Sequence, residues 1–238
     1  MTFPLYTALT AGEFSNIKAL PERPGWMACH FSSYGTDLTN LPRWLPPNAM
    51  LIVNDRTPVC GHDAGLIKDQ ILQLIESFSV SRILLDFQRA DSPEAADIVN
   101  ALVENLPCPV GVTEIYAEGL NCPVFVTLPI HTPLSCAISR WEGRKLWLEA
   151  ALDAETITVT PTGSRFTFLP KVYPPEACHH DANLHCHYQI SVTPQQAEFT
   201  LFRTPEDLVQ LLESAKTQNF ACAVGLYQEL QNTPALLL

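Results

Sequence analysis

Short runs of hydrophobic residues recur along the chain, and several of them do not alternate with polar positions. Residues 51–53 are Leu, Ile and Val, and residues 83–85 are Ile, Leu and Leu. An unbroken apolar run of this length is typical of a strand that is covered on both faces, as in a parallel sheet. We therefore predict seven strands: 26–31, 50–55, 82–87, 109–114, 123–130, 145–152 and 220–230. The two runs lie within 50–55 and 82–87.

A helical period follows some of these strands. Apolar residues recur every three or four positions over 67–78 and over 98–103, which indicates amphipathic helices. Four residues stand where their side chains can cap such helices: Asp63, Ser92, Thr132 and Thr204. A proline comes directly after Ser92 and after Thr204, at the first helical position, where the missing N–H group is not needed.

Strands that alternate with helices form a parallel sheet, and repetition of this unit around a closed circuit gives a barrel. The fold is therefore predicted to be α/β, a TIM-barrel-like (β/α) barrel over residues 1–238 as a single domain. Fewer than eight complete units can be counted, so an incomplete or irregular barrel is among the expected forms. Between about 151 and 203 the pattern changes to paired alternating runs around turns, which predicts an antiparallel β-hairpin insertion.

The charge of the chain narrows the ligands that it can bind. The net charge is −11 and the isoelectric point is near 5.0. Such a surface repels nucleic acid and anionic lipid, so we expect neither as a partner, while neutral ligands such as sugars stay open. The N-terminus has no secretory pattern and no apolar run is long enough to span a bilayer. We expect a cytoplasmic protein without a membrane partner.

Polar residues stand at the ends of the predicted strands, where barrels of this kind carry their functional groups. They are acids, amides and tyrosines: Asn54, Asp55, Asp86, Gln88, Glu114, Tyr116, Glu149, Tyr227, Gln228 and Glu229. Amides and carboxylates hydrogen-bond sugar hydroxyls, and two carboxylates can act as acid and base or nucleophile. Asp86, Glu114 and Glu149 are the candidate catalytic residues. Asn54, Asp55, Gln88, Tyr116, Tyr227 and Gln228 are the candidate substrate-binding residues. The alternative is that a polar residue merely ends each strand.

The stretch SRILLDFQ (81–88) resembles the strand motif of chitinase-like family-18 glycoside hydrolases, Asp-x-x-Asp-x-Asp-x-Glu. Asp86, Phe87 and Gln88 match its ending with Gln in place of Glu, while Ser81 and Leu84 occupy the positions of the earlier aspartates. The resemblance implies a carbohydrate-directed TIM barrel without a cofactor. In the family the glutamate protonates the leaving group, which an amide cannot do. The resemblance thus implies either an inactive, sugar-binding relative or an acid supplied by another residue, such as Glu114 or Glu149.

Two other functions stay open. Cysteines and histidines gather over 178–187, and a strand starting at His185 would place His185 and His187 on one face, as in a metal-dependent hydrolase. These residues fall in the insertion, away from the barrel strands, and no C-x-x-C spacing occurs, so we predict no metal site. The third possibility is a non-catalytic barrel that binds a partner protein through the hairpin insertion.

Overall fold

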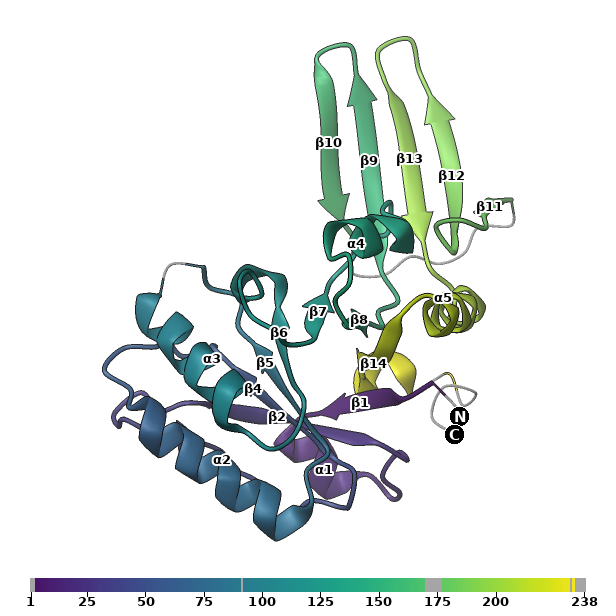
Figure 1. Cartoon of the computed structure of the whole chain (residues 1–238). Helices are drawn as coiled ribbons and strands as arrows, with labels where there is room; N and C mark the ends of the chain where they lie inside the picture. The colour runs from purple at the N-terminus through teal and green to yellow at the C-terminus, as the bar shows by residue number, and fades with distance from the viewer. Residues whose placement is uncertain (1–2, 91, 170–176, 232, 234–238) are drawn as a thin grey trace.

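Eight parallel strands close into a barrel in the computed structural model, which describes residues 3–90, 92–169, 177–231 and 233 (Figure 1). They are β1 (Leu5–Leu9), β2 (Pro24–Phe31), β4 (Met50–Asn54), β5 (Arg82–Asp86), β6 (Val110–Thr113), β7 (Val124–Val126), β8 (Leu146–Glu149) and β14 (Phe220–Leu226). The barrel closes because β1 is hydrogen-bonded to β14 on one side and to β2 on the other. A short strand, β3 (Leu38–Thr39), adds to β2 in antiparallel orientation. The predicted barrel is confirmed, and the barrel strand that the sequence pattern had not revealed is β1.

Helices of unequal length connect the strands. They are α1 (Ala11–Asn16), α2 (Ala64–Phe78), α3 (Pro93–Asn105), α4 (Leu134–Arg140), α5 (Pro205–Thr217) and α6 (Tyr227–Leu230). A single 3-10 turn, η1 (Glu114–Tyr116), takes the place of a helix between β6 and β7, which is why so few residues separate these strands. The barrel is therefore complete in its strands and irregular in its helical layer.

The predicted caps can be compared with the helix starts. Asp63 accepts hydrogen bonds from the N–H groups of Gly65 and Leu66, and Ser92 accepts one from Ala95. Thr204 forms a capping box with Asp207 at the start of α5. The prediction for Thr132 is wrong, because α4 begins at Leu134 and its N-cap position is occupied by Pro133, which has no side-chain oxygen to offer.

Side chains alternate between two cores along each barrel strand. In β4, Met50 and Ile52 pack inside the barrel, whereas Leu51 and Val53 pack between the strands and the helices. Both faces are thus buried, which explains the unbroken apolar run. The same alternation in β4 and β5 turns the next inward positions, Asn54 and Asp86, toward the mouth of the barrel.

The insertion forms a separate antiparallel sheet that projects from the barrel (Figure 1). Its strands are β9 (Ala154–Thr160), β10 (Gly163–Phe168), β11 (His179–Asp181), β12 (Cys186–Val192) and β13 (Ala197–Phe202), arranged in the order β10-β9-β13-β12-β11. The two predicted hairpins, β9–β10 and β12–β13, are confirmed. Among the described residues, no helix has both the length and the apolar character needed to cross a membrane.

Candidate functional site

A cavity of about 560 Å³ opens at the carboxyl ends of the barrel strands. Its polar lining comes from eight residues that end the strands or follow them closely, together with one from α6: Thr10, His30, Asn40, Asn54, Arg56, Asp86, Gln88, Glu149 and Glu229. Its floor is apolar and includes Met27, Ile52, Leu84, Phe125 and Val224. An apolar floor with a few convergent polar groups is the usual form of a small-molecule site.

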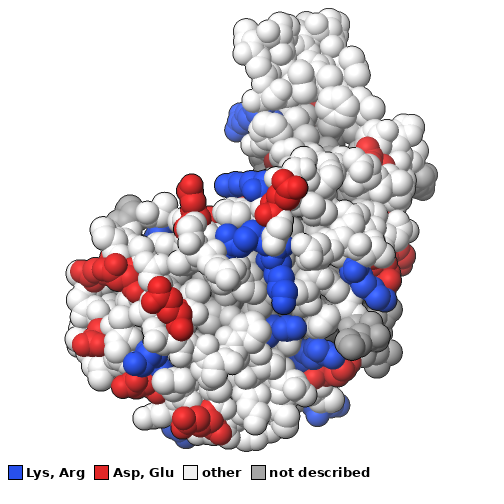
Figure 2. All heavy atoms as spheres, viewed as in Figure 1, with Lys and Arg blue, Asp and Glu red and all other residues white. Residues whose placement is uncertain are grey.

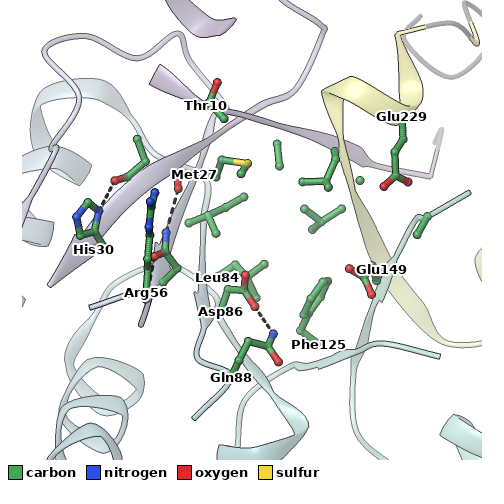
Figure 3. A pocket seen from close by; sticks show the side chains of 18 of the residues that line it. Thr10, Met27, His30, Arg56, Leu84, Asp86, Gln88, Phe125, Glu149 and Glu229 are labelled. Carbon is green, nitrogen blue, oxygen red and sulfur yellow. Dashed lines mark hydrogen bonds between the residues drawn. The ribbon is translucent and has the colours of Figure 1, made fainter. Parts of the chain in front are cut away.

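The polar groups are spread around the mouth in the order of the strands that carry them. Figure 3 shows His30 and Arg56 on one side of the cavity and Glu149 and Glu229 on the other. Asp86 lies between these two groups, beside Gln88 at the end of β5 (Figure 3). A ligand in the cavity can therefore be contacted from both sides at once.

Four of the predicted site residues come together in this cavity: Asn54, Asp86, Gln88 and Glu149. The Gln88 amide donates a hydrogen bond to Asp86 Oδ1 at 2.5 Å. The Asn54 amide donates to the carbonyl oxygens of Met27 and Cys29 in β2, at 3.0 and 3.1 Å. Asn54 is thus largely occupied in joining β2 to β4, while Asp86 and Gln88 form one polar unit within the cavity.

Asp55 lies behind the cavity rather than in its lining. It is buried, and its carboxylate accepts hydrogen bonds from the backbone N–H groups of Gln88 at 3.0 Å and Arg89 at 2.8 Å. The adjacent residue, Asn54, takes the inward position, so Asp55 points outward. Asp55 therefore holds the end of β5 in place and acts on the cavity through Gln88.

The other predicted residues lie outside the cavity lining. Glu114 forms an ion pair with Arg140 at 3.1 Å and accepts a hydrogen bond from the Trp141 indole at 2.9 Å. The Tyr116 hydroxyl donates to the carbonyl oxygen of Arg89. Tyr227 and Gln228 belong to α6, and the residue of that helix that lines the cavity is Glu229.

The sequence pattern pointed to Glu229 as a strand-end residue but not to its place in the site. β14 ends at Leu226 and the chain turns into α6, so the period of two no longer tells which side chain faces inward. Thr10, His30, Arg56 and Phe125 were also missed. Thr10 follows the unrecognised β1, and β2 contains a register shift between Trp26 and Cys29 that obscures its alternation before His30.

Burial and mutual repulsion change the acidity of the carboxyl groups in the cavity. Burial raises the pKa of Glu149 to about 7, against a hydrogen bond from Thr127 that lowers it; the charges of Asp153, Asp86 and Glu229 raise it further. Burial also raises the pKa of Asp86, although its hydrogen bond with Gln88 acts in the opposite direction. Glu149 can therefore hold a proton near neutral pH, which is what a general acid requires.

The histidines of the insertion are arranged differently from the predicted pair. His185 has a φ of 49° and lies in the turn before β12, so it does not share a strand face with His187. The cross-strand neighbour of His187 is His180, and both contact the buried Asp207, at 2.7 Å from His187 Nδ1 and 3.2 Å from His180 Nε2. Within the described ranges, no group of three or more His, Cys, Asp or Glu side chains is arranged to hold a metal ion.

The described fold resembles solved glycoside hydrolases, although a scan against protein-family models and a search of curated proteins find no match. A family-18 N-acetylglucosaminidase from Paenibacillus barengoltzii aligns with a TM-score of 0.60 and 10% identity over 94% of both chains. A family-18 chitinase from Cycas revoluta, in complex with (GlcNAc)4, aligns with a TM-score of 0.59 and 9% identity over 98% of this chain and 97% of its own. A class V chitinase from Nicotiana tobaccum, in complex with NAG4, aligns with a TM-score of 0.59 and 9% identity over 94% of this chain and 93% of its own.

Identities this low show a shared fold and nothing more specific. The alignment with the Cycas chitinase covers 98% of the chain, so it takes in most of the hairpin insertion as well as the barrel. The resemblance suggested by residues 81–88 is thus confirmed at the level of architecture: the chain has the barrel fold of chitinase-like family-18 glycoside hydrolases.

Proposed function

We propose that this protein binds an oligosaccharide of N-acetylated amino sugars in the cavity at the barrel mouth. The observation that carries the proposal is the convergence of Asp86, Gln88, Glu149 and Glu229 above one apolar floor. Carboxylates and amides hydrogen-bond sugar hydroxyls and acetamido groups, while the apolar floor suits the face of a sugar ring that presents C–H bonds.

The charges in the cavity favour a neutral ligand over an anionic one. Its lining holds three carboxylates, Asp86, Glu149 and Glu229, against one arginine, Arg56. A phosphorylated or acidic ligand would meet net repulsion from this set as well as from the net charge of −11 on the whole chain. A chito-oligosaccharide carries no charge and avoids both.

The family resemblance implies a mechanism in which the residue at the position of Gln88 is the acid. In that mechanism a glutamine favours sugar binding without hydrolysis. An amide can donate and accept hydrogen bonds but has no proton to transfer to a leaving group. The two chitinases described above were themselves captured with their tetrasaccharides as variants in which a glutamate is replaced by glutamine. A glutamine is therefore compatible with sugar binding in those barrels, and we extend this to Gln88.

Isothermal titration calorimetry with chitotetraose tests the binding proposal. We expect Asp86→Ala to weaken binding about 10- to 100-fold, because a hydrogen bond to a charged group contributes about 1.5–3 kcal/mol. Glu114→Gln is the matched control, since Glu114 is a strand-end carboxylate outside the cavity lining. Binding too weak to detect in the unmodified protein, or equal losses in both variants, would refute the proposal.

Hydrolysis is a second candidate, favoured by the pKa of about 7 at Glu149. In this mechanism Glu149 replaces the missing acid and protonates the glycosidic oxygen. Release of the fluorophore from an aryl chito-oligosaccharide would then be lost in Glu149→Gln, kept in Glu114→Gln, and would decline above pH 7 in the unmodified protein. Tetrasaccharide binding without any turnover would rule out hydrolysis and leave sugar binding as the proposed function.

A further inference from the structure

One face of the projecting sheet is apolar and exposed. The strand registers place on this face Ile157, Val159, Phe166, Phe168, Tyr188, Ile190, Val192, Phe199 and Leu201, which we call the apolar face. The opposite face is polar and includes Thr156, Thr158, Arg165, Thr167, Gln189, Ser191, Glu198 and Thr200. A sheet that is polar on one side and apolar on the other normally buries its apolar side against another layer.

Among the described residues, those that cover the apolar face lie at its barrel end, over β9, β12 and β13. At that end Ile130, Cys186 and Leu201 form a small buried cluster with Ile157, Leu184, Tyr188 and Phe199 packed against it. Beyond this cluster the side chains are open to solvent: Val159 is 37% exposed, Ile190 47%, Phe166 52% and Val192 73%. At the barrel end of the edge strand β10, Phe168 lies opposite Glu155 and is 69% exposed. The described part of the chain thus leaves the outer half of this face, and its edge at β10, without a covering layer.

The exposed patch has the size of the apolar part of a standard interface. A full aromatic side chain presents on the order of 200 Å², so these five side chains together expose on the order of 500 Å². A stable interface buries roughly 800 Å² on each partner, of which about 60% is apolar. The patch is also as large as the largest patches on ordinary monomers, which are about 300–600 Å² and are often functional.

We propose that two copies of this chain associate through their apolar faces, packed face to face as a β-sandwich. This inference concerns the insertion and goes beyond the proposed function of the barrel mouth. A two-fold interface needs a surface that is complementary to itself. The outer half of the apolar face meets this requirement, because it carries no Asp, Glu, Lys or Arg that could meet a like charge on the other copy. The acids of this face, Glu155 and Asp181, lie at its barrel end, where Glu155 is hydrogen-bonded to His131 at 2.6 Å.

The shape of the face also suits a second copy. A groove of about 410 Å³ runs along it, lined among others by Ile157, Tyr188 and Phe199. Phe166 and Phe168 on the adjacent edge strand β10 stand beside this groove and are well exposed. One face therefore supplies both the protruding aromatic side chains and the hollow that can receive them, and such anchors are the centres of stable interfaces.

The overall charge argues against a membrane as the covering surface. Anionic lipid would be repelled by the net charge of −11, and the apolar face has no basic residues at its outer half to offset it. Figure 2 shows the outer end of the projecting sheet white on the side in view, with the visible charged residues on the barrel and on the lower part of the sheet. Packing through the sheets keeps the two acidic barrels apart, so repulsion between copies opposes association little.

Light scattering coupled to size-exclusion chromatography, run over a range of protein concentrations, tests the proposal. We expect a species of twice the chain mass of 26.4 kDa in the unmodified protein. Phe168→Glu combined with Val192→Glu should raise the dissociation constant by about 100-fold or more, because two charges would be buried in an apolar interface. Phe168→Ser with Val192→Ser should act in the same direction without adding charge.

The matched control is Thr167→Glu combined with Ser191→Glu, which places the same two charges one residue away on the polar face. This variant should stay dimeric, and circular dichroism should give the same spectrum for all variants, since the four positions are exposed. A monomer at every concentration up to about 100 μM, which means a dissociation free energy below roughly 5–6 kcal/mol, would overturn the proposal. Dissociation of the control would also overturn it, because it would place the contact at the edge of the sheet instead of on its face.

Discussion

Glu149 shows how one side chain can link the cavity to the stability of the protein. Its pKa is raised by burial to about 7 in the folded protein, whereas an exposed glutamate has a pKa of 4.5. Between these values the folded protein holds a proton that the unfolded chain has released, so the free energy of unfolding decreases as the pH rises from about 4.5 through 7. Above pH 7 the folded protein carries the full cost of the buried charge.

Replacement of Glu149 by Gln should remove this pH dependence. We expect Glu149→Gln to raise the free energy of unfolding by roughly 1–3 kcal/mol at pH 8 and to change it little at pH 4.5. Urea denaturation at the two pH values measures the difference, and Glu114→Gln serves as the control. Equal effects of Glu149→Gln at both pH values would contradict the assignment of the raised pKa to this residue.

Asp55 should affect the cavity without contacting the ligand. Its carboxylate holds the backbone N–H groups of Gln88 and Arg89 from a buried position, so Asp55→Ala leaves these donors unpaired. We expect a loss of about 2–3 kcal/mol in unfolding free energy and weaker chitotetraose binding. Urea denaturation and calorimetry measure the two effects. A variant that loses neither stability nor affinity would show that Gln88 is held by other contacts.

The positions of Asn54 and Asp55 also show what a sequence pattern can and cannot settle. The end of β4 was predicted to within one residue, and both residues were selected because they follow the apolar run. Side chains alternate along the strand, so Asn54 faces the same way as Ile52, and Asp55 faces the same way as Leu51 and Val53. Whether Asn54 or Asp55 faces inward therefore depends on which of these two sets faces the interior of the barrel. In a strand buried on both faces the two registers have the same apolar pattern, so only the structure distinguishes them.

At the scale of elements, β6 and β8 meet at a place that only glycine permits. A Cβ atom added to Gly111 would lie 2.3 Å from a carbon of the Trp147 ring, which is fully buried inside the barrel. Overpacking of this kind costs about 1–3 kcal/mol because rigid neighbours must move. We expect Gly111→Ala to lower the midpoint of urea unfolding accordingly.

The control for this substitution is Gly12→Ala, because a Cβ at Gly12 would meet no atom within 4 Å. Gly12 lies in α1, where alanine is the better helix former, so this variant should be as stable as the unmodified protein or slightly more stable. Equal stability of Gly111→Ala and the unmodified protein would mean that Trp147 can shift at little cost.

Elements with strong local signals were the ones that could be predicted. The capped helices α2, α3 and α5 and the two hairpins of the insertion carry their signals within a few residues, and all of them are confirmed. β1 was missed although it closes the barrel. Only its pairing with β2 and β14 identifies it as a barrel strand, and β14 lies more than 200 residues away in the chain.

At the scale of the whole molecule, the barrel and the insertion have separate hydrophobic cores. The cluster inside the barrel and the cluster beneath the helices contain no residue from 155–201, and neither does the lining of the mouth cavity. The chain enters and leaves the insertion at neighbouring points, because Ala154 and Phe202 are paired across β9 and β13. A two-residue Asn-Gly turn can join such a pair.

Replacement of residues 155–201 by Asn-Gly should therefore leave a folded barrel. Because the apolar face is removed, we expect this variant to be monomeric by light scattering. Because the cavity is intact, it should bind chitotetraose within about threefold of the unmodified protein, a change of less than 1 kcal/mol. Some stability should be lost, since Asp207 at the start of α5 no longer contacts His180 and His187. A folded variant that has lost sugar binding would mean that the insertion takes part in the site, and a folded variant that stays dimeric would place the interface on the barrel.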